Sequence, residues 1–159
     1  MNNEWLKIVL YRPEIPQNTG NIGRTCVGLN IPLIIVGRPS FSLEDKELKR
    51  AGLDYWQYLN LRKYESWETF LEIEKADNIL IFTKSGKKSI FEANITEGSY
   101  LIFGRETEGL PKDIMEKYKE NSIYLPIIGN VRSYNLANTV AVASFEAYRQ
   151  IKFLKQNFK

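Results

Sequence analysis

The sequence contains no histidine and only one cysteine, Cys26. Without histidine, neither a Ser-His-Asp triad nor a Cys-His pair can be assembled. The remaining acidic residues show no spacing typical of metal ligands, and a lone cysteine cannot form an intrachain disulfide. The chemistry of this chain is therefore expected to use neither imidazole nor a metal ion.

Long hydrophobic runs are also missing. No apolar run approaches the ~20 residues that span a bilayer, and the start, MNNEWLKIVLY, lacks the basic and apolar regions of a signal peptide. We therefore expect a cytoplasmic protein with no membrane contact. The net charge of +3 suits a polyanionic partner and suits equally a protein without one.

What the sequence does contain is material for one α/β domain over residues 1–159. Short apolar runs predict strands, and most are continuously apolar, as in a parallel sheet covered by helices on both faces. The predicted strands are LKIVLY from Leu6, LIIVG from Leu33, NILIFT from Asn78, SYLIFG from Ser99 and SIYLP from Ser122.

Helical patterns separate these runs, which gives the βαβ alternation of an α/β fold. The helices are expected around Ile22–Leu29, Leu43–Ala51, Ser66–Lys75 and Pro111–Tyr118.

The chain ends in one long predicted helix. An apolar stripe recurs at spacings of three and four, through Leu136, Val140, Ala143, Ala147, Ile151 and Leu154. A second apolar line flanks it, formed by Ala141, Phe145 and Tyr148. Two explanations fit the second line: a deeply buried helix, or a helix whose extra face packs on a second copy of the chain.

Polar and glycine residues collect after strand ends in three segments: IPQNTGNIGRTC from Ile15, GRETEGLP from Gly104, and LPIIGNVRSYNLANT from Leu125. Ligands of open α/β sheets bind outside the carboxyl ends of strands, so these loops predict one composite site. The first turn lacks the GxGxxG spacing of dinucleotide folds, and no Walker A motif occurs.

These motifs, with RAGLDYW from Arg50 and EAYRQ from Glu146, resemble the TrmL family over about Ile8 to Gln150. This family comprises tRNA wobble-position ribose 2′-O-methyltransferases of the SPOUT superfamily. The resemblance implies a SPOUT fold with a deep C-terminal trefoil knot, a homodimer and an S-adenosylmethionine site. It also implies tRNA as the substrate, with leucine isoacceptors expected. Ribose methylation of another RNA such as rRNA and a catalytically silent RNA-binding protein are the alternatives.

The resemblance also assigns residues to the methyl donor. Gly104 lets the backbone approach a ligand, although turn geometry alone would also explain Gly104 and Gly109. Ser133 and Asn135 precede the last helix, where they could cap it, bind the donor, or do both. The donor-binding residues implied are Phe82, Gly104, Glu106, Leu125, Ile127, Ser133 and Asn135.

On the substrate side, the resemblance assigns catalysis to Arg24, with Asn18. Their spacing of six predicts that a loop Asn18 and a helical Arg24 face one pocket. Two roles are open for Arg24: a guanidinium that stabilises the developing alkoxide and grips a phosphate, or a proton relay. The high pKa of arginine favours the first role.

Further cations are candidates for RNA contact. Lys46, Lys49 and Arg50 share one side of a predicted helix, which could equally be a solvated face. Arg105 and Arg132 stand in the polar loops, where they would contact phosphates or merely aid solubility.

Overall fold

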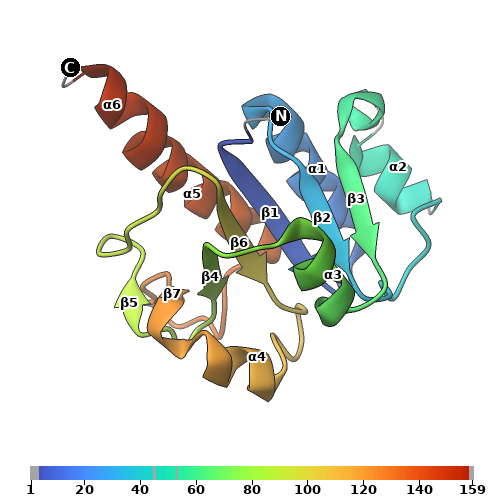
Figure 1. The fold of residues 1–159 in the computed structure, drawn as a ribbon. Helices are drawn as coiled ribbons and strands as arrows, with labels where there is room; N and C mark the ends of the chain where they lie inside the picture. The colour runs from blue at the N-terminus through green and yellow to red at the C-terminus, as the bar shows by residue number, and fades with distance from the viewer. Residues whose placement is uncertain (1–3, 45, 53, 158–159) are drawn as a thin grey trace.

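The computed structural model describes residues 4–44, 46–52 and 54–157, with the backbone alone at 49, 51, 52 and 157. Its centre is a seven-stranded sheet in the order β3-β2-β1-β6-β4-β7-β5, and every pairing is parallel (Figure 1). The strands are β1 (Leu6–Tyr11), β2 (Leu33–Val36), β3 (Leu61–Tyr64), β4 (Ile79–Phe82), β5 (Lys88–Ser89), β6 (Ser99–Phe103) and β7 (Ser122–Tyr124).

The predicted strands are all present, and the parallel sheet is confirmed. The residues of β2, β4 and β6 are buried throughout, which explains their continuously apolar sequences. Two strands escaped prediction. β3 lies at the sheet edge and carries Arg62 and Lys63, while β5 has only two residues, so neither shows an apolar run.

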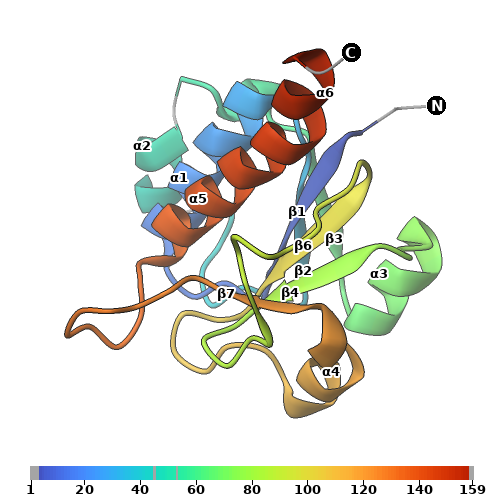
Figure 2. The same ribbon diagram turned by 90° about the vertical axis from the view of Figure 1, so that its left-hand side faces the viewer.

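Helices cover both faces of the sheet (Figure 2). On the first face, Leu6, Ile8 and Leu10 of β1 join Ile22 and residues of the last helix in one core cluster. On the second, alternate residues such as Val9 join a second cluster that includes Trp67, Phe70 and Ile114. This alternation leaves no strand face of β1 exposed and gives a three-layer α/β/α arrangement.

The helices on the first face are α1 (Pro16–Leu29), α2 (Lys46–Gly52), α5 (Leu136–Tyr148) and α6 (Leu154–Asn157); those on the second are α3 (Trp67–Glu74) and α4 (Lys112–Lys117). Short turns of 3₁₀-helix, η1 (Trp56–Tyr58) and η2 (Lys119–Asn121), complete them.

The prediction that helix α1 begins near Ile22 is wrong. It begins at Pro16, so the asparagines and glycines expected in a turn lie in its first two turns. Proline at the first position suits a helix start because its missing N–H has no intrahelical acceptor. Gly23 serves close packing: a methyl group there would lie 3.0 Å from the Trp56 ring.

The long C-terminal helix is confirmed, with one local change. Helix α5 passes through a π-helical segment, η3 (Arg149–Phe153), into α6. Val140, Ala143, Ala147 and Ile151 of the predicted stripe are buried, and Leu136 packs against the same core. The trefoil knot remains a prediction.

Candidate active site

Because all strands run parallel, their carboxyl ends meet at one edge of the sheet, the lower edge in Figure 1. A cavity of about 780 Å³ opens there. Its walls come from the segments that follow β4, β6 and β7, together with the beginnings of α1 and α5. The three polar segments that were expected to form one composite site therefore line one cavity.

Every residue assigned to the methyl donor lines this cavity. So do Asn18, Arg105 and Arg132 from the substrate assignments. The floor is aromatic, since the Phe82 and Phe103 rings stack with centroids 4.8 Å apart. Leu125 and Ile127 add apolar wall. This combination of a flat apolar slot and polar loop groups suits a nucleoside.

The loop after β6 is a tight reversal that shapes one wall. Arg105 and Gly109 exchange backbone hydrogen bonds of 3.1 and 3.0 Å. A methyl group on Gly104 would lie 2.3 Å from the Gly109 carbonyl carbon, so only glycine fits. Gly109 has φ +65, a conformation that favours glycine. Turn geometry therefore requires both glycines, and it brings bare backbone to the cavity.

Glu106 ties this loop to the start of α1. Its carboxylate accepts hydrogen bonds from the N–H groups of Glu14 (2.8 Å) and Ile15 (3.0 Å). Glu14 in turn accepts from the N–H and hydroxyl of Thr107, at 3.1 and 2.8 Å. Since the N-cap residue Ile15 offers no side-chain acceptor, Glu106 supplies the negative charge that a helix N-terminus favours.

Two asparagines join the remaining walls. The Asn135 amide donates to Asn18 Oδ1 at 2.9 Å, and Asn18 Nδ2 donates to Glu106 at 3.4 Å. Asn135 Oδ1 also accepts from the N–H groups of Ala137 and Asn138, so Asn135 rather than Ser133 caps α5. One chain of hydrogen bonds thus connects the β6 loop, α1 and α5. Glu14 and Thr107 are members of this network that the sequence pattern did not single out.

Residues 5–145 match the model of the SpoU rRNA methylase family. The chain belongs to this family. The SpoU match confirms the methyltransferase resemblance seen in the motifs.

Individual relatives of this SpoU family member are also close. Proteins named tRNA (cytidine(34)-2′-O)-methyltransferase are 44% identical in Methylovorus glucosotrophus, covering 92% of this chain and 96% of that protein, and 40% identical in Escherichia coli, covering 93% and 95%. A structure described as giving insights into 2-OH methylation of C/U34 on tRNA superposes with a TM-score of 0.88 at 43% identity, covering 94% and 97%. The predicted fold class is therefore confirmed.

Arg24 requires a correction. It does not line the cavity with Asn18, because Asn18 is buried in the first turn of α1 and Arg24 is exposed on another side of that helix. Residues six apart on a helix point about 120° away from each other. The Arg24 guanidinium instead lies 5.1 Å from the centre of the Tyr55 ring. Within one protomer of the SpoU fold, the two predicted catalytic side chains therefore face different surroundings.

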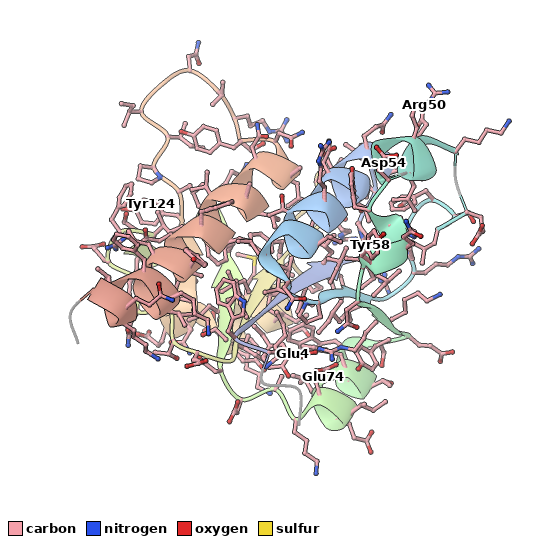
Figure 3. The ribbon with its side chains drawn as sticks, turned by 90° about the horizontal axis from the view of Figure 1, so that it is seen from above. Glu4, Arg50, Asp54, Tyr58, Glu74 and Tyr124 are labelled. Atoms are coloured by element: carbon pink, nitrogen blue, oxygen red, sulfur yellow. The ribbon has the colours of Figure 1, made fainter. Side chains whose placement is uncertain are left out.

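The other cations divide between two places. Arg105 and Arg132 border the cavity, and Arg105 pairs with Glu108 at 3.0 Å. Lys46 and Arg50 are exposed on α2, and Figure 3 shows Arg50 pointing outward. The Lys49 side chain lies outside the described residues.

Two further features bear on the chemistry. Burial raises the pKa of the Cys26 thiol well above its ordinary value, so this cysteine is a core residue rather than a nucleophile. Across the described ranges, no group of three or more Cys, Asp or Glu side chains is placed to hold a metal ion, and no helix is long and apolar enough to cross a membrane.

Proposed function

We propose that this protein transfers a methyl group from S-adenosylmethionine to the ribose 2′-hydroxyl of the wobble nucleotide, position 34, of tRNA in the cytoplasm. The observation that carries the proposal is the cavity at the carboxyl edge, whose walls contain every donor-binding residue that the motifs imply. The names of relatives at 40 and 44% identity support tRNA position 34 over rRNA. Leucine isoacceptors are the expected substrates.

The donor fits the cavity by its chemistry. Adenine would occupy the apolar slot beside Leu125 and Ile127, and backbone groups near Gly104 would meet its polar edge. The donor's sulfonium is already activated, so the reaction needs positioning and charge stabilisation rather than a metal. The S–CH₃ bond breaks as the O–CH₃ bond forms, S-adenosylhomocysteine leaves, and the hydroxyl proton passes to an acceptor.

Arg24 would act from a second copy of the chain. Its position outside the cavity of its own protomer is understandable if a partner brings it to the neighbouring donor site. The guanidinium would then stabilise the developing alkoxide and grip an adjacent phosphate, a role that needs no deprotonation. Its contact with the Tyr55 ring would restrict its orientation before RNA arrives.

An apolar face on α5 supports such a homodimer. Val142 is 50% exposed, Phe145 59% and Tyr148 39%, and Ala141 is partly buried between them. The predicted second line therefore does not enter the protomer core, apart from an edge contact of Tyr148 with Trp5. Exposed apolar clusters of this kind mark interfaces, and a two-fold contact hides the same patch on both copies.

Calorimetry with S-adenosylmethionine, in buffer containing a chelator, tests the donor site. We expect saturable binding without added metal. No heat of binding at millimolar ligand, or binding only after zinc is supplied, would contradict the proposal. Mass mapping of ribose methylation after incubation with tRNA or rRNA then identifies the substrate, and methylation of rRNA alone would favour the alternative.

A further inference from the structure

Arginines follow three adjacent strands at their carboxyl ends, on the side of the sheet where the cavity opens. Arg38 comes two residues after β2, Arg12 directly after β1, and Arg105 two residues after β6. The strands are in register there, since Tyr11 pairs with Val36 and Leu10 with Phe103. Neighbouring strands lie about 4.8 Å apart, so these arginines form a row that leads away from the cavity.

Arg12 holds an unusual backbone conformation. Its φ of 45 lies in the left-handed region, which costs a residue with a side chain roughly 1–2 kcal/mol. Its N–H still bonds to the Val36 carbonyl at 2.9 Å. The side chain crosses Gly37, where a methyl group would lie only 2.7 Å from Arg12 Cγ. This conformation lays the side-chain stem across the end of β2 at Gly37, and the guanidinium lies 5.5 Å from the centre of the Tyr11 ring. Strained residues of this kind cluster at functional sites.

The two outer arginines carry uncompensated charge. Arg105 pairs with Glu108, whereas among the described residues neither Arg12 nor Arg38 has an ion-pair partner. Both are exposed and line a second groove of about 820 Å³ with Pro39, Ser40, Phe41 and Ser42. Guanidinium groups beside serine hydroxyls suit phosphate oxygens, which arginine can bind through two parallel hydrogen bonds.

The segment that follows β1 joins the groove to the cavity wall. Arg12 lines the groove, while Glu14, two residues later, binds Thr107 of the cavity wall. A polyanionic strand whose target nucleotide enters the cavity would therefore pass the arginine pair next. Among the described residues, no acidic side chain lines the groove, so none of those residues repels an anion there.

We propose that Arg12 and Arg38 bind backbone phosphates of the RNA strand beside the nucleotide that is methylated. This inference rests on the proposed function and adds a substrate-positioning site to it. Phosphate contacts of this type fix the strand without reading its sequence. The site therefore raises affinity for any RNA that presents a flexible single strand to the cavity.

The test uses Arg12→Gly, Arg38→Gln and the double variant, with binding of a fluorescent anticodon stem-loop RNA measured by anisotropy over a range of salt concentrations. Each lost phosphate contact should reduce the slope of log affinity against log salt by about 1. Arg12→Gly should not lower the melting temperature, because glycine removes the left-handed strain. Affinity for S-adenosylmethionine should not change, and Arg12→Lys should keep most of the RNA affinity.

Lys75→Gly provides a matched control. Lys75 is also an exposed cation in the left-handed region, with φ 51, but it caps the end of α3, before the amino end of β4. Its removal should leave RNA affinity unchanged. Unchanged slopes in the double variant, or an equal loss in Lys75→Gly, would overturn the proposal. So would tight binding of inorganic phosphate that leaves RNA affinity intact, because the groove would then be a small-anion site.

The outcomes also separate the two proposals. A wild-type protein that binds RNA through these arginines without methylating tRNA would contradict the proposed function and leave the phosphate site standing. Normal methylation together with unchanged RNA binding in the double variant would contradict the phosphate site and leave the proposed function standing.

Discussion

Polar clusters occupy both ends of the sheet, and they differ in how completely their charges are paired. Near the amino ends, Arg62 donates two hydrogen bonds to Glu4 at 3.1 and 3.0 Å, and its Nε lies 3.0 Å from Glu74. Figure 3 looks onto this end and shows Glu4 and Glu74 close together. The hydroxyls of Tyr64 and Tyr100 also donate to Glu74. This cluster is closed on itself.

At the carboxyl ends, acidic side chains join loops to helices, while two arginines have no acidic partner. Glu14 and Glu106 hold the cavity wall together, and Arg12 and Arg38 make no ion pair with the described residues. Paired charges mainly specify a structure, whereas exposed unpaired cations attract an anionic ligand. The comparison therefore assigns a structural role to the amino-end cluster and a functional role to the carboxyl-end one.

Replacing Arg24 should give the largest functional effect. Arg24→Ala should reduce methyl transfer by at least about 10²–10³-fold, the cost of removing one preorganised charge-stabilising donor, with donor affinity within a few fold. Arg24→Lys should also be poor because an ammonium lacks the planar fork. Single-turnover assays on tRNA and calorimetry measure the two quantities. Near wild-type turnover in either variant would reassign Arg24 to structure.

Breaking the apolar face of α5 should rank next. Phe145→Glu would bury a carboxylate in the proposed dimer interface, at a cost of several kcal/mol unless the dimer separates. Sedimentation should show a monomer, and tRNA methylation should be lost while the fold persists.

Ile73→Glu is the control, because Ile73 is 61% exposed on α3, across the sheet. It should remain dimeric and active. A wild-type protein that is monomeric and fully active at micromolar concentration would contradict the proposal that Arg24 acts at the donor site of a partner protomer.

The sequence predicted the parts of the molecule whose signal is local. Apolar runs revealed the buried strands, and the motif residues of the cavity followed strand ends. The start of α1 was missed because its capping acid, Glu106, is 91 residues away from Ile15. The wrong prediction that Asn18 and Arg24 face one pocket has the same cause, because both residues lie on a helix and the helix sets the directions of their side chains. Arg12 and Arg38 became candidates only when strand register placed them side by side.

The smallest expected effect concerns Tyr64, in the paired cluster near the amino ends of the strands. Burial, followed by the hydrogen bond to Glu74, raises the pKa of Tyr64 to about 12 from an ordinary 10.0. Because the folded state holds this proton more tightly than the unfolded chain, the resulting stability is complete below pH 10 and is lost as pH rises toward 12.

Tyr64→Phe should therefore lower the free energy of unfolding at pH 7 by about 1 kcal/mol, the usual net value of one hydrogen bond. It should also flatten the alkaline decline in stability, although Tyr100, whose pKa is raised for the same reasons, should preserve part of that decline. Denaturant unfolding at several pH values between 8 and 12 measures both effects. Methyl transfer at pH 7.5 should be unchanged, since Tyr64 contacts neither the cavity nor the arginine groove. A variant that retained its stability but lost methylation would reverse the roles assigned to the two ends of the sheet.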